Sequence, residues 1–231
     1  MHSMPKAVVL HSGGLDSATV LAIAQAEGFA VHALTVSYGQ RSVIEVDYAR
    51  EMAARLKVAA HVVLNLDLAP IGAAVPTSFA AARDARGAYC LPARNTLLLS
   101  LGLAWMQTLR ARDIFLGFNS DYSSCPDHSM EFMAQFQKLA DTATTLPDGE
   151  HVRLHLPLDG LTKSETIRRG IELKVDYNFT HTCFNFHDTS SALRAGSRHA
   201  CGTCDACKSR RQGFTELGLK DPAFGSGPTA V

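Results

Sequence analysis

The chain has 231 residues, which suits one large domain or one domain with a small appendage. Hydrophobic residues make up 46% and charged residues 19%, which excludes a disordered chain and is ample for a packed core. Lys plus Arg and Asp plus Glu both number 22, so a net charge of zero gives no global attraction to nucleic acid or anionic membranes. No apolar run reaches the ~20 residues of a membrane span, and the start of the chain lacks a signal peptide's apolar region, so we expect a soluble cytoplasmic protein.

Short apolar runs alternate with helical patterns along the chain. The first run, Lys6 to Leu10, leads into a Ser-Gly-Gly turn and predicts a buried strand. Further strands are predicted at 31–36, 61–66, 113–117 and 152–156. Helical spacing predicts helices at 17–27, 96–106 and 130–143, and capping boxes at Ser42 and Thr162 open two more. This order predicts an α/β fold with a doubly wound, parallel five-stranded sheet.

The segment order also predicts where a ligand binds. Ser12, Ser37 and Asn119 each follow a strand, so their loops should meet in one crevice at the carboxyl ends of the strands. Residues 96–106 are apolar on nearly all sides, which predicts a helix buried in the centre. Residues 67–92 predict a long loop with a short helix near 80–83.

We divide the chain into three parts. Residues 1–178 are expected to form a nucleotide-binding α/β domain, and residues 179–224 a zinc-binding C-terminal segment. Residues 225–231 are expected to be a disordered tail.

The turn after the first strand has the character of a phosphate loop. Glycines let the backbone approach a ligand, and the free N–H groups at a helix start favour an anion. The hydroxyls of Ser12 and Ser17 add donors. Asp16 would repel phosphates unless it holds Mg²⁺ or caps the helix. Neither the common P-loop motif nor G-x-G-x-x-G is present.

Six cysteines are distributed unevenly along the chain. Cys201, Cys204 and Cys207 form C-x-x-C-x-x-C, with Cys183 upstream. Four thiolates suit a tetrahedral Zn²⁺ site of the structural kind. A nearby histidine replacing Cys183, an iron–sulfur cluster, or disulfides in a secreted protein remain alternatives; the candidate histidines are His181, His187 and His199.

A series of motifs in the same order resembles one known family. The loop Ser-Gly-Gly-x-Asp-Ser is similar to the pyrophosphate loop of the N-type ATP pyrophosphatase (PP-loop) superfamily. The other motifs resemble its 7-cyano-7-deazaguanine synthase (QueC) family: Tyr38-Gly-Gln-Arg41, Pro92-Ala-Arg-Asn95, Leu116-Gly117 with Asn119, Asp121-Tyr-Ser123, Pro126-Asp127, Thr162-Lys163 and the Cys201 to Cys207 run. The resemblance covers about residues 6 to 222.

The resemblance implies an adenine nucleotide alpha hydrolase-like fold and an ATP-dependent ligase. Such an enzyme converts 7-carboxy-7-deazaguanine and ammonia to the nitrile through an adenylated carboxylate and an amide. ATP with Mg²⁺, structural Zn²⁺ on the four cysteines and a homo-oligomer, expected to be a dimer, belong to this expectation. The expected ATP-binding residues are Leu10, His11, Ser12, Gly13, Gly14, Leu15, Asp16, Ser17 and Ala18.

Further site residues are expected beside the loop. Lys163 starts a helix, where a cation opposes the dipole, so it either faces solvent or neutralises phosphate charge. Arg94 either clamps a phosphate or carboxylate, or makes a salt bridge at a helix start. We expect Asp16, Lys163 and Arg94 to be catalytic. The expected substrate-binding residues, several of which would equally suit capping, turns or core packing, are Tyr38, Gln40, Arg94, Asn95, Asp121 and Asp127.

Two segments depart from the family pattern. Ser124-Cys-Pro-Asp-His-Ser129 stands where the family has Gly-Tyr-Pro-Asp-Cys-Arg, and Thr180-His-Thr-Cys-Phe184 stands where it has Thr-Trp-Ser-Cys-Tyr. A second hypothesis is therefore an enzyme that stops at the amide or joins the acid to another amine, including an amine on a protein. A third is a tRNA-modifying PP-loop enzyme, for which no RNA domain is visible, and a fourth is an ATP-sensing module without turnover.

Overall fold

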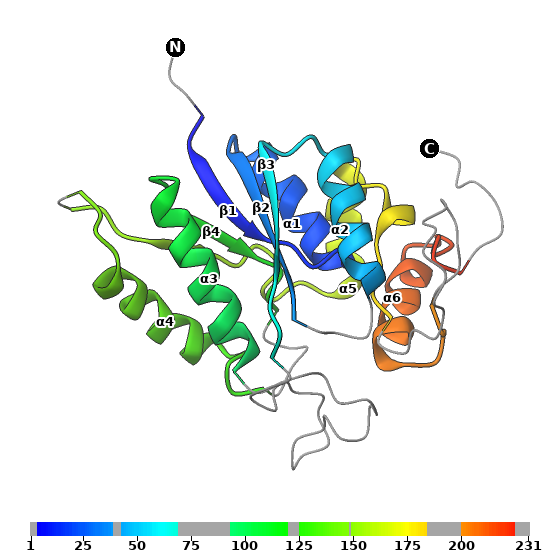
Figure 1. Cartoon of the computed structure of the whole chain (residues 1–231). Coiled ribbons are helices and arrows are strands. Elements are labelled where there is room, and N and C mark those ends of the chain that lie inside the picture. Colours follow the sequence, from blue (N-terminus) through cyan, green and yellow to red (C-terminus); the bar gives the residue numbers. More distant parts are fainter. Residues whose placement is uncertain are drawn as a thin grey trace.

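The computed structural model describes residues 4–38, 43–68, 93–119, 125–147, 149–183 and 200–224. At its centre lies a five-stranded parallel sheet in the order β3-β2-β1-β4-β5 (Figure 1), which confirms the predicted α/β class. The strands are β1 (Lys6–Leu10), β2 (Ala30–Ser37), β3 (Ala60–Asn65), β4 (Asp113–Leu116) and β5 (Arg153–His155). The chain builds outward from β1 in one direction and then in the other. The order of the sheet therefore reverses between β1 and β4, where a doubly wound sheet opens its ligand crevice.

Alternating side chains of the strands face two separate cores. Ala7, Val9 and Phe115 pack with α1 (Leu15–Ala26), and α2 (Val43–Arg55) and α5 (Lys163–Glu172) complete this core. Val8 and Ile114 point the other way, toward α3 (Arg94–Thr108) and α4 (Met130–Ala143). Consecutive residues of β1, β2 and β4 are therefore buried, as expected for a parallel sheet that lies between two layers of helices.

The helix predicted at 96–106 exists as part of α3, but its predicted central burial is wrong. Only Leu99, Gly102, Leu103 and Met106 of α3 are buried, whereas Ser100, Ala104 and Gln107 are exposed. In Figure 1, α3 lies outside the sheet. Its further apolar side chains are only partly buried, among them Leu98, Leu101 and Trp105. An apolar pattern all round a helix thus did not distinguish a central position from an outer layer.

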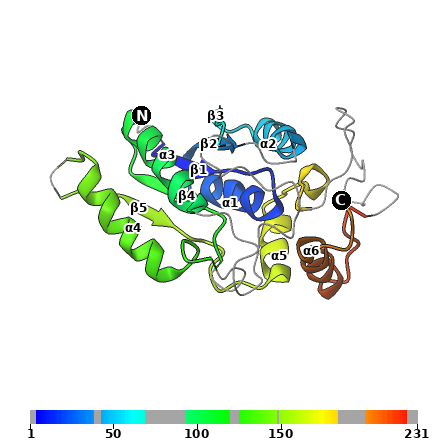
Figure 2. The ribbon, with the colours of Figure 1, turned by 60° about the horizontal axis from the view of Figure 1, so that its bottom comes forward.

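The C-terminal segment contains a helix that the sequence pattern did not reveal. After a 3₁₀ turn at Tyr177–Phe179, the chain returns as α6 (Asp205–Glu216), which lies beside α5 (Figures 1 and 2). The buried side of α6 is made of Cys207, Arg210, Gly213 and Phe214. This set holds one large apolar side chain, so no hydrophobic stripe marks the helix.

Part of what the sequence predicts falls outside the described residues: the segment 69–92 with its helix near 80–83, Ser42 of the first capping box, and the tail 225–231. The second capping box is confirmed. The hydroxyl of Thr162 accepts the amide of Glu165, and the Glu165 carboxylate accepts the amide of Thr162. Within the described ranges, none of the helices has the length and apolar character needed to cross a bilayer.

Candidate nucleotide site and metal centre

The loop between β1 and α1 packs against the backbone of α2 at Gly13. Gly13 adopts φ +83°, a left-handed conformation that favours glycine. A Cβ at this position would also collide with the carbonyl oxygen of Glu45 and lie 2.9 Å from the amide nitrogen of Ala49. Both observations require glycine at this position.

The end of β4 approaches the same loop. A Cβ on Gly117 would lie 3.2 Å from the amide nitrogen of Ser17 and 3.4 Å from the Cβ of Asp16. The Leu-Gly pair after β4 therefore brings bare backbone against the start of α1, at the point where the sheet order reverses.

The first turn of α1 offers backbone donors. Ala18 donates its N–H to the Gly14 carbonyl at 3.0 Å, the first backbone bond of the helix. In the described residues, the amides of Leu15, Asp16 and Ser17 have no carbonyl acceptor. The Ser17 hydroxyl accepts the Ser12 amide and contacts the Ser12 hydroxyl, both at 3.2 Å. The Ser17 hydroxyl itself donates to the Gly14 carbonyl at 3.2 Å. The three amides are a group of N–H donors that suits an anion.

His11, the residue after β1, contacts this loop through its side chain. It is buried, and its Nδ1 lies 3.1 Å from the Ser17 hydroxyl. Burial, together with the nearby His61, lowers the pKa of His11 to about 3, so the ring is neutral at physiological pH. Thr35 donates to the His11 carbonyl at 2.6 Å and contacts Nε2 of His61 at 2.8 Å. His11, predicted as an ATP-binding residue, thus lies behind Ser17.

A lysine and an aspartate from distant parts of the chain meet at the loop. Nζ of Lys163 donates to both carboxylate oxygens of Asp16, at 2.7 and 2.8 Å. The Lys163 side chain is 13% exposed, which rules out the solvent-facing alternative. The N-cap of α1 is Gly14 without a side-chain cap, so Asp16 does not cap this helix. The ammonium instead neutralises a carboxylate beside the donor group.

A second polar group gathers around Arg94, the first residue of α3. Burial raises the pKa of Tyr38, and the charge and hydrogen bond of Arg94 oppose this shift. Burial raises the pKa of Glu45 to about 7, again opposed by the charge of Arg94. The guanidinium therefore lies near a phenol and a carboxyl group. Glu45 was missed from the sequence as a site residue, although it precedes Tyr48 by one helical turn and so shares the buried side of α2.

Asp127 and Asn95 connect the start of α3 to the segment after β4. The Asp127 carboxylate accepts the amides of Asn95 and Thr96, at 2.7 and 3.4 Å. The Asn95 side chain donates to the Asp127 carbonyl at 2.9 Å. For Asp127 the structure shows the capping alternative, and a role of either residue in substrate binding stays a prediction. Gln40 and Asp121 lie outside the described residues.

The departures from the family pattern near Asp127 have structural partners here. Nε2 of His128 lies 2.9 Å from the Asn119 carbonyl, and the ring stacks on Phe118. Ser129, at the position where the family carries arginine, is the N-cap of α4 and accepts the amide of Phe132 at 3.1 Å. These substitutions therefore hold the local backbone.

The four predicted cysteines come together. Their Sγ atoms all lie within 4.8 Å of one another, and those of Cys201 and Cys207 are 4.0 Å apart. A tetrahedral Zn²⁺ with Zn–S bonds of about 2.3 Å separates its sulfurs by about 3.8 Å. The Cys183 sulfur accepts the Cys201 amide at 3.2 Å, and the Cys201 sulfur accepts the Cys204 amide at 3.3 Å. Four sulfurs at this spacing can hold a metal ion.

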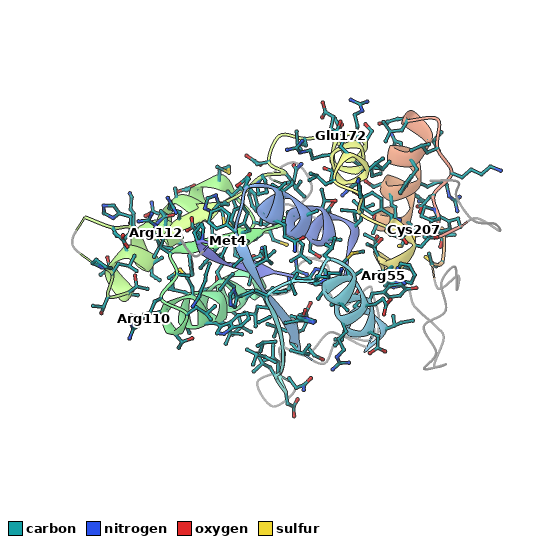
Figure 3. The ribbon with its side chains drawn as sticks, turned by 90° about the horizontal axis from the view of Figure 1, so that it is seen from above. Met4, Arg55, Arg110, Arg112, Glu172 and Cys207 are labelled. Atoms are coloured by element: carbon teal, nitrogen blue, oxygen red, sulfur yellow. The ribbon has the colours of Figure 1, made fainter. Side chains whose placement is uncertain are left out.

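The fourth member of this cluster is Cys183, as predicted. His181 is not among its four residues; its ring stacks on Tyr48 and its Nε2 lies 3.2 Å from the Cys183 carbonyl. The alternative ligands His187 and His199 lie outside the described residues. Figure 3 shows Cys207 on α6, far from Arg110 and Arg112 at the other end of the molecule.

The sequence model of the family described as "Queuosine biosynthesis protein QueC" matches residues 6–218. The chain belongs to the QueC family. It is 46% identical over 227 residues to the 7-cyano-7-deazaguanine synthase of Stenotrophomonas maltophilia (strain K279a), covering 96% of this chain and 99% of that protein. It is 45% identical to the enzyme of the same name from Frankia casuarinae, covering 96% of this chain and 94% of that protein. These matches place this QueC member among the enzymes of queuosine biosynthesis.

Solved structures support the fold of this QueC member. A 4-thiouridine synthetase in complex with RNA and bound ATP superposes with a TM-score of 0.51 at 18% identity. The match covers 74% of this chain and 41% of that protein. At this identity the likeness supports the architecture alone.

Proposed function

We propose that the chain is an ATP-dependent ligase that converts 7-carboxy-7-deazaguanine and ammonia to 7-cyano-7-deazaguanine. One observation carries the proposal: a donor-rich loop with a neutralised carboxylate lies at the switch point of the sheet, in a chain 46% identical to a named 7-cyano-7-deazaguanine synthase. The donors suit the terminal phosphates of ATP.

The reaction needs an activated carboxylate, because oxide is too poor a leaving group. The acid attacks the α-phosphate of ATP, giving an acyl adenylate and pyrophosphate. Ammonia then displaces AMP to form the amide. A second ATP activates the amide oxygen, which leaves with AMP as the nitrile forms and the nitrogen loses its protons. The balance is therefore two ATP consumed for each nitrile.

The chain's own residues have distinct tasks in this scheme. The amides of Leu15 to Ser17 and the hydroxyls of Ser12 and Ser17 bind the β- and γ-phosphates. Lys163 removes the repulsion of Asp16 and stabilises charge on the departing pyrophosphate. The Asp16 carboxylate offers the oxygen ligand that Mg²⁺ prefers, and the ion supplies further neutralisation of the phosphates when bound.

Arg94 is assigned to the acid. A guanidinium offers paired donors to a carboxylate, and this one lies near Tyr38 and Glu45 at the carboxyl end of the sheet. The backbone of Glu45 borders Gly13 of the loop, so an acid held by Arg94 would lie on the loop's side of the sheet, where proximity to the α-phosphate is the main requirement.

Zn²⁺ is proposed for the four-cysteine cluster as a structural ion. A closed set of four thiolates leaves no open position for substrate, so the ion would hold the C-terminal segment. Metal analysis of the purified protein tests this assignment. The expected result is one zinc per chain, lost in Cys204→Ser.

The test of the function is a turnover assay read by mass. Purified protein receives the acid, ATP, Mg²⁺ and ammonium, and AMP and pyrophosphate are quantified. AMP should form only when the acid is present, and the product should have the mass of the nitrile at two AMP per molecule. Absence of AMP contradicts the proposal. A product that stays at the amide, with one AMP, would favour the alternative enzyme that stops at that stage.

A further inference from the structure

A glycine of helix α6 lies against Lys163, the lysine of the proposed phosphate site. A Cβ on Gly213 would lie 2.8 Å from both Cγ of Lys163 and Cδ1 of Ile167, and 3.1 Å from the Lys163 carbonyl carbon. Gly213 is buried, and Figures 1 and 2 show α5 and α6 side by side. The absence of a side chain at Gly213 therefore sets how closely α6 approaches the residue that pairs with Asp16.

A second connection runs from the C-terminal segment to the loop itself. The amide of His181 donates to the Gly13 carbonyl at 2.9 Å, and the carbonyl of His181 would lie 3.4 Å from a Cβ on Gly14. The His181 ring stacks on Tyr48 of α2 with ring centroids 5.5 Å apart. The backbone just before Cys183 is thus fastened to the left-handed turn of the phosphate loop.

A buried arginine joins the two segments that make these connections. Arg210 of α6 is 2% exposed and donates through Nε to both carboxylate oxygens of Asp221 at 3.0 Å. Its remaining nitrogens donate to the Tyr177 carbonyl at 3.0 Å and to the hydroxyls of Thr180 and Thr182 at 2.8 and 2.9 Å. One side chain therefore joins α6 to the segment that carries His181.

The cysteine cluster fixes the same two pieces at their ends. Cys183 ends the segment held by Arg210, Cys204 is the N-cap of α6, and Cys207 lies in its first turn. Apart from these sulfurs, this part of the cluster buries little apolar surface: Ala200, Ala206 and Phe224 are only partly buried. A metal ion on four thiolates would therefore fasten the N-terminal end of α6 to Cys183, while Phe214 and Arg210 hold the middle of the helix.

We propose that the metal-held helix α6 positions the phosphate site, with Gly213 as the positioning residue for Lys163 and the His181 backbone as the support for Gly13. Metal occupancy should then control ATP affinity, although the cysteines belong to a separate part of the chain. This inference rests on the proposed use of the loop for ATP.

The decisive variant is Gly213→Ala. The added methyl displaces Lys163, so MgATP should bind about tenfold more weakly, the loss expected for one charge-assisted hydrogen bond. The zinc content should remain one per chain, and the variant should still unfold cooperatively, with a melting temperature lowered by the added methyl at a buried contact. Calorimetric titration of the metal-loaded protein with MgATP measures the effect.

Two further variants distinguish displacement of Lys163 from a nonspecific effect of substitution on α6. Ile167→Val removes the Cδ1 atom that the new methyl meets, so it should restore part of the lost affinity in the Gly213→Ala background while changing affinity less than twofold alone. Gln212→Ala alters the exposed neighbouring position on α6 and should leave affinity unchanged. Removal of the metal from the wild type by a chelator should weaken MgATP binding at least as much as Gly213→Ala.

The outcomes distinguish this inference from the function beneath it. If the wild type binds no ATP, the proposed function fails and the inference fails with it. If the wild type binds ATP and Gly213→Ala binds it equally well with its metal in place, only the inference fails. Should Gly213→Ala lose its metal, the chelated wild type decides, and unchanged affinity there contradicts the inference.

Discussion

The two ends of the parallel sheet use charged groups in opposite ways. At the amino end, the buried Asp113 accepts two hydrogen bonds from Arg153, at 2.6 and 2.7 Å, and one from His155 at 2.7 Å. At the carboxyl end, the first amides of α1 lack carbonyl acceptors among the described residues, and Glu45 has a raised pKa beside Arg94. The carboxylate at the amino end has a full set of donors, whereas at the carboxyl end the first amides of α1 have no carbonyl acceptor in the described part of the chain.

Charged and polar groups at the two ends of the sheet therefore serve different purposes: one set stabilises the fold, and the other is proposed to bind a ligand. A buried carboxylate with three donors contributes to folding, because its pairs are complete without a ligand. Donors gathered without acceptors contribute little to folding but are ready for an anion. Substitution of Asp113 should therefore affect unfolding, and substitution of Lys163 beside the loop should affect turnover.

The largest effect is expected from Lys163→Ala. Loss of the ammonium leaves Asp16 facing the phosphates, so kcat/KM for ATP should fall by roughly 10²- to 10³-fold, the range for loss of one transition-state donor. Steady-state AMP formation measures it. Lys208→Ala, which removes a lysine whose side chain is 67% exposed, serves as the control and should keep full activity. Equal rates for Lys163→Ala and the wild type would contradict the proposed role of Lys163 in turnover.

Asp113→Asn should act on stability alone. Burial raises the pKa of Asp113, but the hydrogen bonds of His155 and Arg153 outweigh it and the net pKa is lowered. The carboxylate therefore stabilises the fold above the pKa of the unfolded chain, and this contribution disappears as pH falls through the lowered folded pKa. We expect the variant to lose about 1–3 kcal/mol of unfolding free energy at pH 7.

Urea unfolding of Asp113→Asn across pH checks this expectation. The difference from the wild type should shrink toward low pH, while turnover per folded molecule stays constant. A pH-independent loss, or reduced turnover in fully folded protein, would show that the amino end does more than hold the sheet.

Glu45→Gln should give a smaller effect of opposite sign. Burial raises the pKa of Glu45 from 4.5 to about 7, so the contribution of Glu45 to stability is fully present below pH 4.5 and is lost as pH rises toward 7. The neutral glutamine avoids that loss. The variant should therefore gain roughly 1–2 kcal/mol relative to the wild type at pH 8 and little at pH 4. Chemical unfolding at both pH values measures it, and a variant less stable at pH 8 would contradict the assignment.

Local sequence patterns predicted the sheet, and they singled out the loop after β1 as a candidate site, because this information is local. Short apolar runs between helical segments mark the strands. The loop combines glycines, hydroxyls and a carboxylate within six residues, Ser12 to Ser17. The C-x-x-C-x-x-C run is equally local, and Cys183 followed from its family pattern.

What the sequence did not reveal depends on contacts between distant segments. The Lys163–Asp16 pair spans 147 positions, and the Arg210 clamp joins α6 to residues about 30 positions earlier. The outer position of α3 and the raised pKa of Glu45 depend on how the layers pack. Neither leaves a periodic signal in a single sequence.

The central claim is that the loop from Ser12 to Ser17 receives the terminal phosphates of ATP. A crystal structure of the protein with Mg²⁺ and a non-hydrolysable ATP analogue tests it most directly. We expect the β- and γ-phosphates within hydrogen-bond distance of the amides of residues 15–17, with Lys163 on a phosphate oxygen. Phosphates bound elsewhere, with the Lys163–Asp16 pair unchanged and these amides without a ligand, would contradict it.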